Sequence, residues 1–214
     1  MLMKVTVFGA TGGIGNQVVR QALDRGLTVT AVVRDPVRLD VRHPALEVTT
    51  VATLDEADAL GPVVRGSDAV LSGVGPRGRR DGPVASTATR AILRAMHTEG
   101  VHRLVTVSAA PVGPTPDGDS FLNRRIVLPV ISALLRDLYA DLRAMEHAMA
   151  DSSAQWTVVR PPKLVNKTMT GRYRTAIDGN VARGYTISRA DVAHAMLAAA
   201  GDPATIRRAI GIAY

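Results

Sequence analysis

The chain has no cysteine among its 214 residues, so it can form neither a disulfide framework nor a thiolate metal site. This absence favours a cytoplasmic location. Aromatic residues make up only 3%, which leaves few stacking surfaces for single-stranded nucleic acid. No apolar run reaches the roughly 18 residues that span a bilayer. We therefore expect neither a nucleic-acid partner nor a membrane partner.

The formal net charge of +7 is nevertheless typical of a protein that binds an anionic partner. The basic residues are scattered, apart from a dense cluster at 77–80, and a cleft for a phosphorylated small molecule would use this charge better than nucleic acid. The sequence lacks the Gly-x-Ser-x-Gly elbow of hydrolases and the His-Glu-x-x-His spacing of zinc enzymes. We therefore expect a small-molecule substrate and no bound metal.

Short β-branched runs alternate with longer helical patterns along the chain. The runs that predict strands are 4–8, 28–33, 46–51, 68–72, 103–108, 156–159 and 209–213, with shorter candidates at 171–177 and 185–187. The patterns that predict helices are 14–25, 86–100 and 189–200, the last with Ser188 as its N-cap. A further long helical region has one apolar stripe, formed by Leu134, Leu138, Leu142, Met145 and Met149.

Repeated strand–helix–strand units predict an α/β fold, a doubly wound parallel sheet of the Rossmann type with helices on both faces. The sequence contains no convincing linker, so we expect residues 1–214 to form one domain. Loops at 109–130 and 163–190 would lie over the carboxyl edge of the sheet, where the C-terminal loops would form a small substrate lobe.

Glycines recur as Gly9-x-x-Gly12-x-x-Gly15 between the first predicted strand and the first predicted helix. In this context glycines permit a tight turn, close approach of the backbone to a diphosphate, and close contact between helix and strand. The N-terminus of the helix then offers free N–H groups to the phosphates. No Gly-Lys-Ser/Thr follows, so this is not a nucleoside-triphosphatase loop. The pattern predicts a dinucleotide site.

The end of the second strand indicates which dinucleotide is bound. A cofactor without a 2′-phosphate calls for a carboxylate there, whereas one with it calls for arginine. Arg34 comes first after the strand, and Asp35-Pro36 is typical of an N-cap followed by the first residue of a helix. We therefore expect NADP(H) rather than NAD(H).

The glycine motif, Arg34-Asp35, Val107-Ser108-Ala109, Arg160-Pro161-Pro162 and the segment 187–193 together resemble the atypical short-chain dehydrogenase/reductases. The chain is most similar to the NAD(P)H-binding group that includes flavin reductase/biliverdin reductase B and the NmrA-like proteins. The resemblance implies a set of cofactor-binding residues: Gly9, Thr11, Gly12, Gly13, Ile14, Gly15, Arg34, Gly73, Val74, Ser108, Pro161 and Pro162.

Departures from the family pattern concern the adenine contact and the catalytic groups. Ala52-Thr53 stands where many relatives have Gly-Asp, and Tyr139-x-x-x-Arg143 replaces the familiar Tyr-x-x-x-Lys. Arginine can supply the charge that lowers a tyrosine pKa but does not exchange a proton. The candidate catalytic residues are Ser108, Tyr139 and Lys163. For Tyr139, an interfacial position beside a solvated ion pair of Arg143 and Glu146 is the alternative.

The sequence thus predicts an NADPH-dependent reductase that transfers hydride to a small conjugated acceptor, which could be flavin-, quinone- or carbonyl-like. Two alternatives stay open. One is an NmrA-like redox sensor that binds the dinucleotide without turnover, and the other, ranked lower, is an epimerase or dehydratase. The protein is expected to be a monomer or a homodimer.

Overall fold

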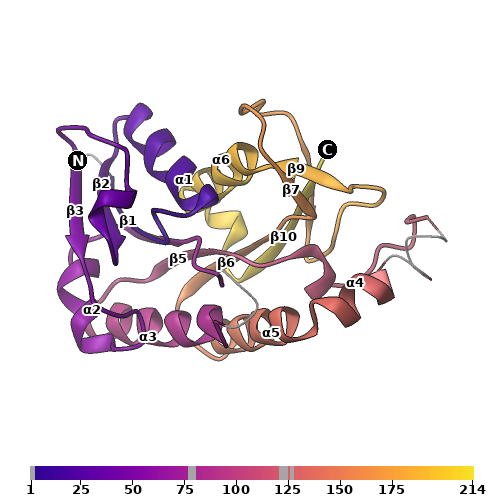
Figure 1. Cartoon of the computed structure of the whole chain (residues 1–214), viewed down its shortest axis with the longest axis horizontal. Coiled ribbons are helices and arrows are strands. Elements are labelled where there is room, and N and C mark those ends of the chain that lie inside the picture. The colour runs from indigo at the N-terminus through magenta and orange to yellow at the C-terminus, as the bar shows by residue number, and fades with distance from the viewer. Residues whose placement is uncertain (1–2, 77–80, 121–124, 126–127) are drawn as a thin grey trace.

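Eight strands form the central sheet of the computed structural model, which describes residues 3–76, 81–120, 125 and 128–214 (Figure 1). The strands of this sheet are β1 (Lys4–Phe8), β2 (Thr28–Val33), β3 (Leu46–Thr50), β4 (Ala69–Ser72), β5 (Arg103–Val107), β6 (Gln155–Arg160), β8 (Arg174–Ile177) and β10 (Arg208–Ala213). A separate parallel pair consists of β7 (Lys163–Val165) and β9 (Thr186–Ser188). The basic cluster at 77–80 lies outside the described residues.

The order of the strands confirms the doubly wound sheet that the sequence predicts. They lie in the order β3-β2-β1-β4-β5-β6-β10-β8, and only β8 runs antiparallel to its neighbour. The direction of winding reverses between β1 and β4. In open α/β sheets, ligands bind at the carboxyl ends of the strands beside such a reversal.

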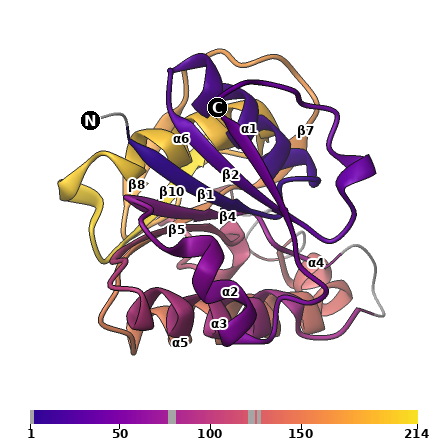
Figure 2. The same ribbon diagram turned by 90° about the vertical axis from the view of Figure 1, so that its left-hand side faces the viewer.

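Helices cover both faces of the sheet (Figure 2). They are α1 (Gly13–Asp24), α2 (Ala57–Val64), α3 (Val84–Thr98), α4 (Leu128–Leu134), α5 (Arg136–Ala150) and α6 (Arg189–Ala200), with short 3-10 turns η1 (Pro36–Arg38), η2 (Ala110–Val112) and η4 (Pro203–Thr205). Helices α1 and α6 pack together on one face, whereas α3 contacts both α2 and α5 on the other. None of the described helices has both the length and the apolar character that crossing a bilayer requires.

Strand β1 is buried on both faces, as is usual for a central strand of a parallel sheet. Val5 and Val7 belong to the core beneath α1 and α6, and Phe8 belongs to the core beneath α2, α3 and α5. Thr6 faces the second layer too, and its hydroxyl donates to the carbonyl of Val63 at 3.0 Å. Both layers are therefore fixed to the strand that carries the glycine loop.

A buried arginine holds the end of α6 against the sheet. Arg103, at the start of β5, is 7% exposed, and its guanidinium donates to the carbonyls of Ala199 at 2.5 Å and Ala200 at 3.3 Å. It also donates to the hydroxyls of Thr157 and Thr205. Burial lowers the pKa of Arg103 to about 10, so the group stays charged at neutral pH. The cation is satisfied by the negative end of a helix.

Helix α2 was not predicted from the sequence, because it contains Gly61 and Pro62, both poor helix formers. It forms because Leu60 and Val64 are fully buried against the sheet layer. The helical region that follows β5 also differs from the prediction. Helix α4 ends at Leu134, which is 62% exposed, and α5 begins at Arg136.

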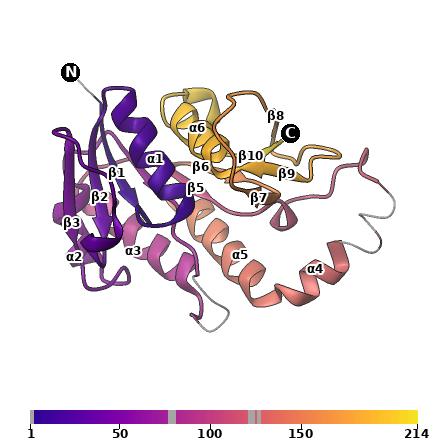
Figure 3. The same cartoon turned by 45° about the horizontal axis from the view of Figure 1, so that its top comes forward.

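Leu134 therefore does not belong to the buried stripe, and the stripe starts at Leu138. Figure 3 shows α4 projecting away from the layer that α5 covers. The short strands expected at 171–177 and 185–187 are present as β8 and β9. Ser188 is the N-cap of α6, as predicted, and its hydroxyl accepts a hydrogen bond from the N–H of Asp191.

Asp191, in the first turn of α6, gathers hydrogen bonds from three separate segments. Its carboxylate is fully buried and accepts from the backbone N–H groups of Thr170 and Gly171 and from the hydroxyls of Thr170, Ser188 and Tyr214. Burial alone would raise the pKa of Asp191, but the hydrogen bonds outweigh it, and the pKa lies below its ordinary value of 3.8. The charged form is therefore the stable form in the folded protein.

A lowered pKa in the folded state means that Asp191 stabilises the fold fully above the unfolded value and loses this contribution as the pH falls through the folded value. Asp191→Asn should lower the free energy of unfolding at pH 7 by about 1.5–3 kcal/mol, because charge-assisted hydrogen bonds are lost. Urea unfolding at several pH values should show that this difference narrows below pH 3.8.

Asp40→Asn is the control, since Asp40 pairs with Arg20 at an exposed site and surface pairs contribute little. A stability difference between Asp191→Asn and the native protein that is the same at pH 7 and at pH 3 would contradict this account.

Candidate cofactor-binding site

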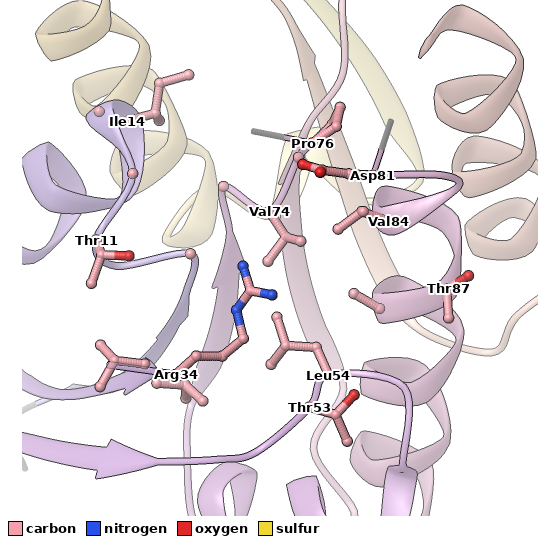
Figure 4. Close-up of a pocket in the computed structure, with 18 of the residues that line it drawn as sticks. Thr11, Ile14, Arg34, Thr53, Leu54, Val74, Pro76, Asp81, Val84 and Thr87 are labelled. Atoms are coloured by element: carbon pink, nitrogen blue, oxygen red, sulfur yellow. The ribbon is translucent and has the colours of Figure 1, made fainter. Parts of the chain in front are cut away.

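A cleft of about 530 Å³ opens at the carboxyl edge of the sheet, beside the reversal between β1 and β4 (Figure 4). Its walls come from the loop after β1, the ends of β2 and β4, the segment 52–55 and the start of α3. Leu164 and Arg189 complete it from the C-terminal part of the chain. The cleft therefore lies where the predicted dinucleotide site should be.

The glycine loop is built by close approach of one backbone to another. Gly9 has a φ of +73°, and a Cβ there would lie 2.8 Å from the carbonyl carbon of Gly73. A Cβ on Gly15 would lie 2.1 Å from the carbonyl oxygen of Gly9, which already accepts from the N–H of Gly12 at 2.8 Å. The first and third glycines of the motif are therefore required for different steric reasons. Together they let α1 pack directly against β1 and β4.

The start of α1 is left open to an anion. Its N-cap, Gly12, has no side chain to cap the helix, and the first turn contains no acidic residue. The start of α3 borders the same cleft but is already capped, because the N–H groups of Ala85 and Ser86 donate to the buried carboxylate of Asp141 at 2.8 and 2.9 Å. No side chain caps the N–H groups in the first turn of α1. These donors would fit a diphosphate.

Arg34 reaches into the cleft from the end of β2. Figure 4 shows its guanidinium pointing between Thr11 and Leu54 toward Val74. In the part of the chain that the structure describes, no carboxylate pairs with Arg34. Asp35 does not line the cleft, because its carboxylate accepts from the N–H of Val37 at 3.1 Å and caps η1. The predicted N-cap role of Asp35 is confirmed.

The remaining cofactor residues implied by the resemblance fall into two groups. Gly73 and Val74, after β4, line the cleft together with the residues 9 and 11–14 of the glycine loop, whereas Gly15 packs against Gly9 and does not line it. Ser108, Pro161 and Pro162 do not line it but lie at the ends of β5 and β6, where the N–H of Ser108 donates to Val159 and the N–H of Ala110 donates to the carbonyl of Pro161. These two groups lie on neighbouring strands of one edge.

The three candidate catalytic residues are not brought together around one cavity. Ser108 is 6% exposed, and its hydroxyl has no hydrogen-bond partner among the described residues. Lys163 is exposed at the start of β7, and its neighbour Leu164, not Lys163 itself, lines the cleft. Tyr139 is 5% exposed within the core beneath α3 and α5, and burial raises its pKa.

The surroundings of Tyr139 differ from the expected solvated ion pair. Glu146 pairs with Arg160 at the end of β6, and their side chains are only 14% and 13% exposed. Arg143 is exposed on the same helix. The pair is partly buried and ties α5 to the sheet.

Sequence reasoning missed several residues of the cleft, among them the charged residues Asp55 and Arg189. Asp55 lines it near the expected adenine end, where Ala52-Thr53 replaces the acidic residue of relatives, and its carboxylate accepts from the hydroxyl of Thr53. The signal was present, because Asp55 lies only a few residues beyond the end of β3. Arg189 also lines the cleft; it belongs to the segment 187–193 that carries the resemblance, but its distance from the glycine loop in sequence gave no sign that the two meet.

The model of a protein family described as NAD(P)H-binding matches residues 9–203. The chain belongs to this NAD(P)H-binding family. The match spans nearly the whole chain, including the glycine loop, Arg34 and α6. It agrees with the resemblance to atypical short-chain dehydrogenase/reductases and with the expected cofactor, NAD(P)H.

This NAD(P)H-binding protein is similar to two curated relatives and to one solved structure. It is 34% identical over 167 residues to a (4-alkanoyl-5-oxo-2,5-dihydrofuran-3-yl)methyl phosphate reductase of Streptomyces griseus, covering 78% of this chain but only 50% of that protein. It is 31% identical over 193 residues to an uncharacterised chloroplastic protein of Arabidopsis thaliana, covering 84% of this chain and 68% of that one. The chain thus spans half to two thirds of these relatives.

The solved structure is a short-chain dehydrogenase/reductase of Veillonella parvula in complex with NADP. It superposes with a TM-score of 0.82 at 19% identity, covering 100% of this chain and 95% of that one. At this level of identity the likeness concerns the fold.

Gly15→Ala tests whether the close packing of α1 on β1 is required. The added methyl group would overlap the carbonyl of Gly9, and such overpacking costs about 1–3 kcal/mol of unfolding free energy. Gly201→Ala is the control, because a Cβ there meets its nearest atom only at 4.0 Å. Urea unfolding should separate the two variants, and coincident curves would show that the loop has room to adapt.

Proposed function

We propose that the protein is an NADPH-dependent oxidoreductase that passes hydride to a small conjugated acceptor of the flavin, quinone or carbonyl type. The observation that carries the proposal is the exposed guanidinium of Arg34 in a cleft that the glycine loop also lines (Figure 4). Membership of the NAD(P)H-binding family and similarity to a reductase support it.

Preference for NADPH over NADH follows from two neighbouring side chains. A planar guanidinium matches a phosphate in charge and in geometry. The carboxylate that could have accepted from a ribose 2′-hydroxyl, Asp35, is engaged in capping η1. The end of β2 therefore offers a cation and no free acidic group, an arrangement that suits a 2′-phosphate.

The reacting end of the site would lie at the ends of β5 and β6. When bound, the reduced nicotinamide supplies the hydride. The buried hydroxyl of Ser108 has an unused hydrogen-bonding capacity, which suits it to hold the carboxamide of the nicotinamide or a carbonyl oxygen of the acceptor. Pro161 and Pro162 would shape this pocket, and Lys163 at its rim would attract an anionic acceptor. The balancing proton comes from solvent.

The name of the Streptomyces griseus relative describes an unsaturated lactone whose ring double bond is conjugated with two carbonyl groups and whose side arm is a phosphate ester. Such a compound belongs to the class of conjugated acceptors. Its phosphate would also suit a chain with a net charge of +7. This acceptor therefore belongs in the test beside flavins and quinones.

Turnover is tested by mixing the protein with NADPH and each of four acceptors, a flavin, a quinone, an aldehyde and an acyl-butenolide phosphate, and following absorbance of the reduced nicotinamide. At least one conjugated acceptor should cause NADPH oxidation, and NADH should support a slower rate at equal concentration. Tight binding of NADPH without oxidation by any acceptor would refute the proposed reductase activity.

Arg34→Ala should weaken NADPH binding by about 1.5–3 kcal/mol, the usual effect of losing a charge-assisted contact, and should leave NADH binding nearly unchanged. Calorimetric titration with both cofactors measures the difference. Arg42→Ala removes the same charge from an exposed position outside the cleft, and it should change neither affinity. Equal weakening of both cofactors by Arg34→Ala would reject the assignment of the 2′-phosphate.

One observation favours a second function, an NmrA-like sensor that binds the dinucleotide without turnover. The only tyrosine of the altered Tyr-x-x-x-Lys motif, Tyr139, is buried, and burial raises its pKa, whereas a catalytic acid near neutral pH needs a lowered one. The acceptor panel separates the two functions, because a sensor binds NADPH and oxidises none of it.

A further inference from the structure

Gly13 is the one glycine of the loop that the Gly-x-x-Gly-x-x-Gly spacing leaves unexplained. A Cβ at this position would lie 2.7 Å from Cδ and 3.0 Å from Nε of Arg189. No strand or turn approaches it; the neighbour is this one side chain. Position 13 is therefore small because the side chain of Arg189, the first residue of α6, lies across the loop at the start of α1.

The guanidinium of Arg189 is held in this place. Its Nη1 donates to the side-chain oxygen of Asn166 at 2.6 Å, and α6 packs along α1. The hydrogen bonds of Asp191 and Ser188 fix the first turn of the helix from which the side chain extends. The side chain of Arg189 thus extends to the glycine loop from the hydrogen-bonded first turn of α6.

Its charge has no partner in the described part of the chain. No carboxylate pairs with Arg189 there, and the start of α1, also positive, lies beside it without a capping side chain. A cation at the first position of α6 is in addition unfavourable for the dipole of its own helix. Two uncompensated positive groups converge on one wall of the cleft, an arrangement that an anion would stabilise.

We propose that Arg189 is the second cationic contact of the cofactor and binds its diphosphate, together with the N–H groups at the start of α1. This inference rests on the proposed binding of NADPH in the cleft. It assigns different roles to the two arginines. Arg34 selects the cofactor that has a 2′-phosphate, whereas Arg189 contributes equally to NADPH and NADH because both contain the diphosphate.

The test compares three ligands in calorimetric titrations of the folded protein: NADPH, NADH and adenosine 2′-monophosphate, which has the 2′-phosphate but no diphosphate. Arg189→Gln keeps a side chain that can donate to Asn166 and removes the charge. It should weaken NADPH and NADH by the same factor, about tenfold to a hundredfold, and leave adenosine 2′-monophosphate unchanged. Arg34→Ala should show the complementary pattern, weakening NADPH and adenosine 2′-monophosphate only.

Arg172→Gln is the matched control, since it removes an exposed arginine from the segment that precedes β8, and it should bind all three ligands as the native protein does. Arg189→Lys should restore part of the affinity. Thermal unfolding without ligand should be similar for Arg189→Gln and the native protein, while the upward shift caused by NADPH should be smaller in the variant.

Unchanged dinucleotide affinity in Arg189→Gln would overturn the inference and leave Arg189 as a residue that only ties Asn166 to the glycine loop. Weakening confined to NADPH would overturn it too, because it would place Arg189 at the 2′-phosphate. Failure of the native protein to bind either dinucleotide would instead reject the proposed function itself, and the inference with it.

Discussion

The start of α1 packs backbone against backbone on the end of β1, and the rest of the site is arranged around this contact. Gly15 leaves room for the carbonyl of Gly9, and Gly9 leaves room for the strand end at Gly73. No side chain separates these three segments. The start of α1 is thereby aimed into the cleft, and the positions of Arg34 at the end of β2 and of Arg189 at the start of α6 matter only relative to that helix start.

The helices that begin at this edge differ in whether a side chain caps their first N–H groups, and this difference determines where an anion can bind. Asp141 occupies the start of α3, and Ser188 with Asp191 occupies the start of α6. Both use buried protein groups to satisfy their N–H donors. The start of α1 has no such capping side chain, and Arg34 and Arg189 line the same cleft. Asp55 also lines this cleft.

The parts of this architecture that depend on local sequence were predictable. Neighbouring residues determine the alternation of strands and helices, the glycine spacing and the Asp35-Pro36 cap. The doubly wound sheet and the role of Asp35 could therefore be predicted from the sequence alone. Helix α2 was missed because burial of Leu60 and Val64 outweighs its glycine and proline. Leu134 was misplaced because a periodic pattern does not reveal that a helix breaks at Leu135 and that its first part projects from the body.

The site shows the same division. Gly73, Val74 and the residues of the glycine loop other than Gly15 could be assigned to the cleft from their places after strands. Arg189 could not, because its contact with Gly13 joins positions far apart in the chain. Ser108, Tyr139 and Lys163 stay predictions as catalytic residues. Their chemistry depends on where an acceptor lies, and sequence patterns do not encode that position.

The buried Arg103 gives α6 a second fixed end. This helix has 12 residues, so it extends about 18 Å from the carboxyl edge of the sheet to the amino edge. Its first residue touches the glycine loop, and its last carbonyls are fastened to the base of β5. One helix therefore joins the two edges of the sheet, and the place of Arg189 at the cleft depends on how Arg103 holds the opposite end of α6.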